Sequence, residues 1–456
     1  IAEEGRSSGA TSRNSAVLNA TYRFQFNQSF TFDDACAMVP YLSALGISHV
    51  YASPIHQARA GSTHGYDIVD HAAVSAELGG EEGLRRLGAE LHRHGLGLIL
   101  DIVPNHMGIG GADNRDWLSV LEWGPQSPAA SVFDIDWRRP DADGKLVVAS
   151  LGSPYGEALD KGELKLVFEP AEGSFSIWYW EHRFPLAPST YPMILDRICD
   201  EQPALAEAAA TLRDLRNTAG AGPIEQARKA RADIAAIAKD ATVAAAVAAQ
   251  IEAVNAEPEF LHRLLEAQHY RLVHWRVGSD AINYRRFFDI DDLAGVRVEE
   301  PAVFDRTHAL IDRLVRDGIV AGLRIDHIDG LADPAGYLAA LRRKVGPEVY
   351  VVVEKILEPG EELPRWPIAG TTGYDVLGLL DGVFVDAAHE RSMDGTYRRA
   401  AGVGGDFEDE LRTVKAMILD TLFAGERDAL VARLKDSADA DRHTRDFSAN
   451  TLRRAL

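Results

Sequence analysis

The stretch IVAGLRIDHIDG, residues 319–330, decides the fold prediction because an apolar strand in it ends directly in charged groups. Ile319 to Ile325 has the length and composition of a buried strand, and Asp326 follows it. A helical pattern then covers 334–345, and a second β-branched run covers 349–353. Strand, helix and strand in this order indicate a βαβ unit, whose two strands are parallel neighbours.

The same alternation occurs nearer the N-terminus. We expect strands at 20–26, 48–53 and 96–103, with helices at about 33–45 and 83–94 between them. Asp33 or Asp34 is expected to cap the first helix, and Gly95 to end the second. Strands that alternate with amphipathic helices predict an α/β fold with a parallel sheet, and the unbroken apolar runs suit barrel strands buried on both faces.

Two segments interrupt this alternation and set the domain boundaries that we expect. An inserted domain covers 107–295 after the third strand, and it contains a helical hairpin at about 203–254. A disordered alanine-rich spacer is the alternative for the hairpin. From 376 to 456 the pattern is helical, without a further barrel strand. The remaining ranges are a flexible tail at 1–14 and two parts of one catalytic barrel at 15–106 and 296–375.

The composition of the chain limits the kinds of molecule that it is expected to bind. The chain has 48 Lys and Arg against 69 Asp and Glu, a formal net charge of −21, which repels nucleic acids and anionic membranes. A neutral sugar meets no such repulsion. The two cysteines, Cys36 and Cys199, indicate no disulfide framework or metal motif, so we expect a reducing, cytoplasmic location. No signal-peptide core or membrane-length apolar run is evident, and we expect neither a metal nor another cofactor.

Ionisable residues gather where the predicted strands end, which is the edge that carries active sites in barrels. Bare charges are not tolerated in a core unless they are paired, so their placement at four strand ends favours a functional site. The four segments are Ser62 to Asp67, Asp101 to His106, Gly322 to Gly330 and Val353 to Lys355.

Asp326 and Glu354 are the candidate reacting groups. They end consecutive βα units and lie 28 residues apart, so their side chains should face one cavity from adjacent strands. Glycoside chemistry needs two such carboxyl groups. Arg324 lies on the same side of its strand as Asp326, and we expect it to keep that carboxylate ionised while Glu354 holds its proton. Structurally, Asp326 could instead form a scaffold ion pair with Arg324, and Glu354 a solvated pair with Lys355.

These segments resemble the signature regions of the α-amylase superfamily, glycoside hydrolase family 13. Residues 101–106 match D-x-x-x-N-H, residues 322–326 match G-x-R-x-D, and Glu354 falls at the acid/base position of the third region. His-Gly-Tyr at 64–66 also fits. The resemblance implies a TIM (β/α)8-type barrel, interrupted by a large insertion after strand 3 and by a helical insertion near the C-terminus.

Three further runs, at 282–289, 354–357 and 370–375, resemble the maltooligosyltrehalose synthase branch of that superfamily. The resemblance implies rearrangement of the reducing-end α-1,4 bond of a maltooligosaccharide to an α,α-1,1 bond by retaining double displacement, a step of trehalose biosynthesis. Asp326 would be the nucleophile and Glu354 the acid/base. The residues implied in substrate binding are Tyr66, Asp101, His106, Arg324, His327, Tyr374 and Asp375.

The sequence departs from the superfamily pattern in two places. Asp329 and Gly330 stand where typical amylases have Lys and His, which indicates a different acceptor side. The His-Asp pair that normally carries a third carboxylate is absent from the chain. We therefore expect an incomplete barrel, completed by a remaining C-terminal part of the enzyme. An α-glucan hydrolase, a 4-α-glucanotransferase and an inactive glucan-binding fragment stay open as alternatives, and so does the preferred chain length.

Overall fold

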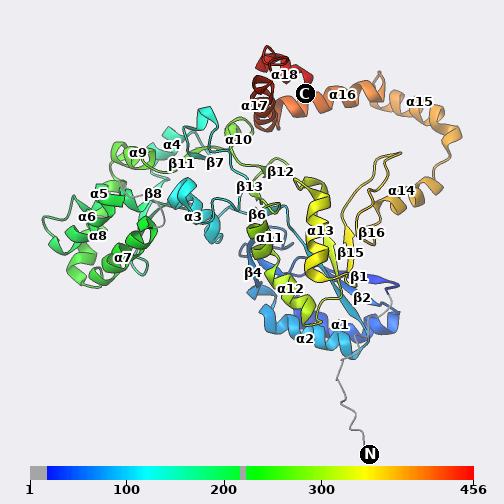
Figure 1. The fold of residues 1–456 in the computed structure, drawn as a ribbon, viewed down its shortest axis with the longest axis horizontal. Helices are drawn as coiled ribbons and strands as arrows, with labels where there is room; N and C mark the ends of the chain where they lie inside the picture. Colours follow the sequence, from blue (N-terminus) through cyan, green and yellow to red (C-terminus); the bar gives the residue numbers. More distant parts are fainter. Residues whose placement is uncertain (1–17, 216–221) are drawn as a thin grey trace, which may run out of the picture. The chain divides into compact units, whose positions relative to one another are not determined.

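A computed structural model describes residues 18–215 and 222–456, and Figure 1 shows its fold. The chain divides into two compact units, each built from two stretches of sequence. The barrel unit comprises Ile1–Gly108 and Arg297–Val385, and the second unit comprises Ile109–Val296 and Asp386–Leu456. The tail expected at 1–14 lies outside the described residues.

One parallel sheet forms the centre of the barrel unit. All neighbouring strands in it run in the same direction, and their order in the sheet follows the order along the chain. This is the arrangement of a TIM-barrel-type fold. The strands, in sheet order, are β1 (Thr21–Phe24), β2 (His49–Ala52), β5 (Gly97–Ile102), β14 (Gly322–Ile325), β15 (Tyr350–Val353) and β16 (Gly370–Thr371).

Helices lie between the first five of these strands along the chain, as the alternation predicts. One detail differs from the expectation. The first helix is capped by Thr31, whose side chain forms a capping box with Asp34, so Asp34 lies inside the first turn. The segment before β14 forms two helices that meet at His308. The helices are α1 (Phe32–Leu45), α2 (Gly80–Arg93), α11 (Pro301–Thr307), α12 (Ala309–Arg316) and α13 (Pro334–Val345).

The middle strands of this sheet are enclosed on both faces. Every residue of β5 and of β14 is buried, and so are Val351, Val352 and Val353 of β15. A parallel sheet with both faces covered has this near-continuous apolar pattern. Charged groups in these strands can therefore reach solvent or substrate only near the carboxyl ends of the strands.

The second unit combines small sheets with a helical region. β7 (Leu146–Leu151) and β11 (Tyr270–His274) form a parallel pair. An antiparallel sheet follows the order β10–β9–β8. Its strands and the helices that follow them are β8 (Lys165–Glu169), β9 (Ser174–Tyr179), β10 (His182–Pro185), α6 (Ala206–Asp214), α7 (Gly222–Ile237), α8 (Ala241–Asn255) and α9 (Pro258–Glu266).

The alanine-rich region is helical rather than a disordered spacer, and it is divided into two helices between Ile237 and Ala241. α7 ends at Ile237, and the Asp240 side chain accepts hydrogen bonds from the first backbone N–H groups of α8. The axes of α7 and α8 differ by 112°. Among the described residues no single helix is long and apolar enough to span a membrane, although α7 and α8 together meet the length and composition criteria.

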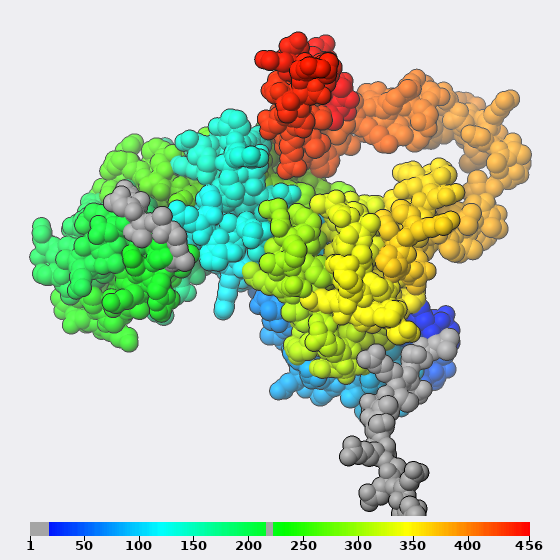
Figure 2. All heavy atoms as spheres, viewed as in Figure 1, coloured from blue at the N-terminus to red at the C-terminus, as the bar shows by residue number. Residues whose placement is uncertain are grey.

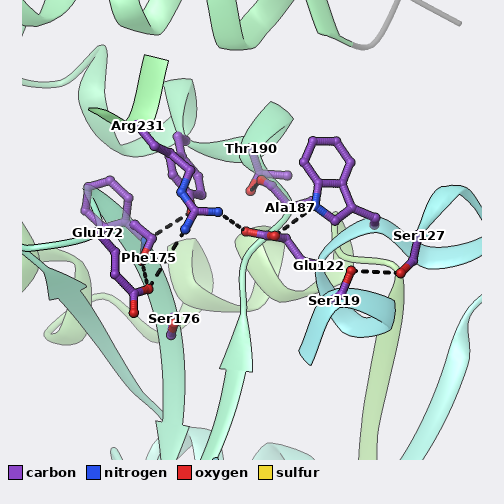
Figure 3. A network of polar contacts seen from close by, with 12 residues as sticks. Ser119, Glu122, Ser127, Glu172, Phe175, Ser176, Ala187, Thr190 and Arg231 are labelled. Atoms are coloured by element: carbon purple, nitrogen blue, oxygen red, sulfur yellow. Dashed lines mark hydrogen bonds and ion pairs between the residues drawn. The ribbon is translucent and has the colours of Figure 1, made fainter. Parts of the chain in front are cut away.

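A partly buried ion network joins the helical region to the sheet of the second unit. Figure 3 shows the Arg231 side chain of α7 between Glu122 and Glu172. Arg231 Nη1 lies 2.7 Å from Glu122 Oε1, and the other oxygen of Glu122 accepts a hydrogen bond from the Trp123 indole. Arg183 contacts Glu172 at 2.8 Å. The network joins α3 (Arg115–Trp123), α7 and the β9–β10 hairpin.

The last part of the chain, orange to red in Figure 2, is helical, and many of its large apolar side chains are exposed. Phe384, at the end of the barrel unit, is 89% exposed, and Phe407 in the second unit is 74% exposed. Exposed apolar surface of this extent is typical of a contact surface for further protein. The helices are α14 (Tyr374–Val383), α15 (Glu390–Ala401), α16 (Phe407–Thr421), α17 (Ala424–Ala440) and α18 (Ala449–Ala455).

Candidate active site

Arg324 lies at the centre of a cluster of three carboxylates in the barrel unit. Its Nη1 is 2.7 Å from Asp101 Oδ1 and 2.6 Å from Asp326 Oδ1, and its Nη2 is 3.0 Å from Glu354 Oε1. Arg324 stands opposite Asp101 in the β5–β14 pairing, and β14 also pairs with β15, after which Glu354 follows. The strand register therefore brings acids from three adjacent strand ends to one guanidinium.

Glu354 is held by both of its carboxylate oxygens. Oε1 contacts Arg324, and Oε2 accepts a hydrogen bond from the backbone N–H of His327 at 2.9 Å. Its side chain is 25% exposed, compared with 8% for Asp326. Lys355 instead pairs with Asp329 at 3.2 Å and with a second acid nearby. Glu354 therefore faces the Arg324 cluster, and a solvated Glu354–Lys355 pair does not form.

Two tyrosines hold the remaining oxygen of Asp101. The hydroxyl groups of Tyr51 and Tyr66 donate to Asp101 Oδ2 at 2.8 and 2.7 Å. Arg23 Nη2 contacts the Tyr66 hydroxyl at 3.3 Å. Burial and the Asp101 charge raise the pKa of both tyrosines, so they remain neutral donors. The sequence analysis did not predict Tyr51 or Arg23 as site residues. Each lies inside an expected strand, where a tyrosine hydroxyl or a charged side chain could have indicated a place in the site.

The protonation of Asp326 differs from the expectation that Arg324 keeps it ionised. Burial raises the pKa of Asp326 to about 7, and the charges of Asp101 and Glu354 act in the same direction, against the effect of Arg324. Burial likewise raises the pKa of Asp101. One guanidinium cannot offset three carboxylates that are removed from water. Asp326 is therefore partly protonated near neutral pH in the free site.

The other residues implied in substrate binding differ in their burial and in their contacts with the Arg324 cluster. His106 is fully buried, with its Nδ1 3.5 Å from the Asn105 amide nitrogen. His327 follows Asp326 in a left-handed backbone conformation. Tyr374 and Asp375 begin α14, where Asp375 accepts a hydrogen bond from Thr371 Oγ1 at 2.7 Å. No hydrogen bond or ion pair described for Tyr374 or Asp375 reaches Arg324, so contacts do not join them to the cluster.

The cluster has the parts that glycoside chemistry requires. Asp326 is a buried carboxyl group beside a more accessible one, Glu354, and both lie at the carboxyl ends of adjacent parallel strands. Two carboxyl groups in this relation can supply a nucleophile and an acid/base. Arg324 orients both of them through charge-assisted contacts.

Comparison with known proteins shows which proteins this chain resembles. Residues 35–145 match the family profile described as alpha amylase, catalytic domain. The parallel sheet and this match make the barrel unit similar to α-amylase catalytic domains. The chain is 36% identical over 416 residues to a putative maltooligosyl trehalose synthase of Mycobacterium tuberculosis. The aligned region covers 88% of this chain. Over most of its length the chain is therefore similar to proteins named maltooligosyltrehalose synthases.

Solved structures give the same relationship. The maltooligosyltrehalose synthase of Arthrobacter ramosus matches 91% of the chain with a TM-score of 0.70 and 35% identity. A hypothetical maltooligosyl trehalose synthase of Sulfolobus tokodaii matches 92% with a TM-score of 0.67 and 31% identity. The chain spans less than half the length of each of these relatives: 42% of the Mycobacterium protein, 45% of the Arthrobacter chain and 46% of the Sulfolobus chain.

Proposed function

We propose that this protein converts the reducing-end α-1,4 linkage of a maltooligosaccharide into an α,α-1,1 linkage, which leaves a trehalose-type end. The observation that carries the proposal is the contact of Asp326 and Glu354 with the two terminal nitrogens of Arg324. The names of the relatives support the choice of reaction within the superfamily.

The reaction proceeds in two displacements. Asp326 attacks the anomeric carbon of the penultimate glucose while Glu354 protonates the oxygen of the departing reducing-end glucose. The released glucose stays in the site and turns, and its own anomeric hydroxyl attacks the covalent intermediate. Glu354 accepts the proton of that hydroxyl, and Asp326 leaves as a carboxylate. Two inversions at one carbon retain its α configuration.

The surrounding groups take supporting roles in this proposal. Arg324 positions both acids, and Asp101, fixed by Tyr66, offers an oriented carboxylate to sugar hydroxyl groups. His106 and His327 follow strand ends beside the acids and bind the glucose at the cleavage point. Tyr374 and Asp375 belong to a substrate-binding segment that approaches when glucan is bound, which accounts for the exposure of Tyr374.

We also propose a complete (β/α)8 barrel for the active protein, with insertions after the third strand and from about residue 376. Its remaining strands and a third carboxylate come from protein outside these 456 residues. Three observations support this arrangement: the chain contains no His-Asp pair, Phe384 and Phe407 are exposed, and the relatives are about twice as long. Cys36 and Cys199 are free thiols, which supports a reducing compartment such as the cytoplasm.

Incubation of the natural full-length protein with maltopentaose tests the proposed reaction. We expect a product of unchanged mass that has lost its reducing end. Free glucose and shorter sugars would indicate a hydrolase, and a ladder of longer and shorter maltooligosaccharides would indicate a 4-α-glucanotransferase. Binding of maltopentaose without any product would leave a glucan-binding protein, and each of these three results would overturn the proposal.

A further inference from the structure

The turn after β14 contains a strained residue. The ladder of the parallel sheet extends one residue beyond β14, where the Asp326 N–H donates to the Ile102 carbonyl at 2.9 Å. His327 then adopts φ 48° and ψ 51°. This is the left-handed conformation, which residues other than glycine rarely adopt. The Gly330 N–H donates to the His327 carbonyl at 3.0 Å and closes the turn.

Gly330 is required in this turn for space rather than for backbone freedom. It is not among the described glycines with positive φ. A Cβ atom at Gly330 would lie 2.2 Å from His327 Cδ2 and 2.6 Å from His327 Nε2. The same point is 2.8 Å from Asn105 Oδ1, which closes the opposite side. The imidazole of His327 therefore occupies the volume that any side chain at position 330 would need.

The left-handed conformation has a consequence for Glu354. It directs the His327 N–H to Glu354 Oε2 at 2.9 Å, while Arg324 Nη2 holds Oε1 at 3.0 Å. A shift of His327 to an ordinary conformation would reorient the peptide that joins it to Asp326. Glu354 would then keep one of these two supports, and its oxygens could rotate about that single contact.

We propose that Gly330 is a positioning residue for the acid/base: it admits the imidazole of His327, which fixes the left-handed turn and so orients Glu354. The inference rests on the proposed double displacement, because it assigns proton transfer to Glu354. Gly330 touches no reacting atom. It acts through His327, and its replacement impairs the steps in which Glu354 moves a proton.

Activity on two substrates distinguishes a specific effect on Glu354 from a general loss of structure. Cleavage of maltopentaose needs protonation of the leaving oxygen, whereas fluoride leaves a maltosyl fluoride of α configuration without it. We expect Gly330→Ala to lower kcat on maltopentaose by about 100-fold with KM changed less than about threefold. The first-turnover release of fluoride, which precedes the step that needs Glu354 as a base, should stay within about threefold of the wild-type rate. Gly156→Ala is the matched control, since that helical glycine has open space around its missing Cβ.

A double-mutant cycle tests the route through the imidazole. His327→Gly removes the ring and adopts the left-handed conformation freely, so adding Gly330→Ala to it should cost less than about threefold. His327→Ala and His327→Gly lose the same ring, but only His327→Ala disfavours the left-handed conformation, so its kcat on maltopentaose should fall further than that of His327→Gly. If Gly330→Ala does not fold, the comparison of His327→Ala with His327→Gly still tests the inference.

Equal loss on both substrates, or a full 100-fold effect of Gly330→Ala in the His327→Gly background, would overturn the inference. So would equal activities of His327→Ala and His327→Gly on maltopentaose. If the wild-type protein forms no trehalose-type product but still hydrolyses or transfers glucan, the proposed function fails, while this inference about Glu354 is still tested with the same pair of substrates.

Discussion

Asp326 and Glu354 are bridged by a single guanidinium: Asp326 Oδ1 lies 2.6 Å from Arg324 Nη1, and Glu354 Oε1 lies 3.0 Å from Arg324 Nη2. The two acids therefore share one cation and one local electrostatic field, which also includes Asp101. A change of charge at any member alters the proton affinity of the others. The pH dependence of activity and the stability of the barrel unit should therefore both depend on this cluster.

The pH dependence of turnover should report Asp326. Its pKa is raised to about 7 by burial and by the nearby carboxylates, and the nucleophile must be ionised. We expect kcat/KM on maltopentaose to fall as the pH is lowered through about 7. Asp101→Asn removes one of the charges that raise this pKa, so its acid limb should move to lower pH even though its maximum rate falls. An acid limb that stays in place, or that moves to higher pH, would contradict this coupling.

Replacement of Asp326 should stabilise the fold above neutral pH. The carboxyl group has a higher pKa in the folded protein than the ordinary aspartate value of 3.8, so the folded state binds the proton more tightly than the unfolded state. Its favourable contribution is complete below about pH 4 and is lost as the pH rises through about 7. We expect Asp326→Asn to raise the free energy of unfolding by roughly 2 kcal/mol at pH 8, with little change at pH 4.

Urea unfolding of Asp326→Asn and wild type at both pH values measures this difference. Arg213→Gln is a useful control, because its exposed pair with Asp196 should matter little at either pH. A variant that is less stable than wild type at pH 8 would mean that the Arg324 pair outweighs the cost of burying the charge.

The ion network of the second unit should be sensitive to the loss of its cation. Arg231→Met leaves the buried Glu122 carboxylate without its closest charge partner. We expect a loss of about 3 kcal/mol at pH 7. Burial already raises the pKa of Glu122, so the loss should shrink as the pH falls and the carboxyl group takes up a proton.

The double variant Glu122→Gln/Arg231→Met separates charge from packing in this network. It should recover part of the lost stability at pH 7, because no unpaired charge remains. Thermal unfolding of the single and double variants at pH 7 and pH 5 gives the comparison. A double variant that is less stable than Arg231→Met at pH 7 would show that Arg231 acts through packing alone.

The sequence predicted the elements whose signals are local. The apolar runs that end in Asp101, Asp326 and Glu354 indicated strands, and the alternation along β14 correctly placed Arg324 beside Asp326. The spacing of Asp326 and Glu354 predicted adjacent strands, which the β14–β15 pairing confirms. These predictions succeeded because strand periodicity and connection length fix which side chains share an edge.

Other features depend on contacts that no local pattern encodes. β16 is only two residues long, Gly370 and Thr371, and was not expected as a strand. The break between α7 and α8 lies in an alanine-rich run without glycine or proline at the bend, and Asp240 is its sole local signal. The role of Tyr51 depends on the register of β2 against β5, and the raised pKa of Asp326 depends on burial. Neither is visible in a single strand.

The most direct test of the central claim, that Asp326 attacks the sugar, is to trap the covalent intermediate. A 5-fluoro-maltosyl fluoride slows both displacements, but its leaving group departs without acid assistance, so the glycosyl-enzyme accumulates. Mass spectrometry of the digested full-length protein should find one added glycosyl group on the peptide that contains Asp326, and none in Asp326→Asn. A label on another carboxylate, or turnover of this substrate by Asp326→Asn at the wild-type rate, would contradict the assignment.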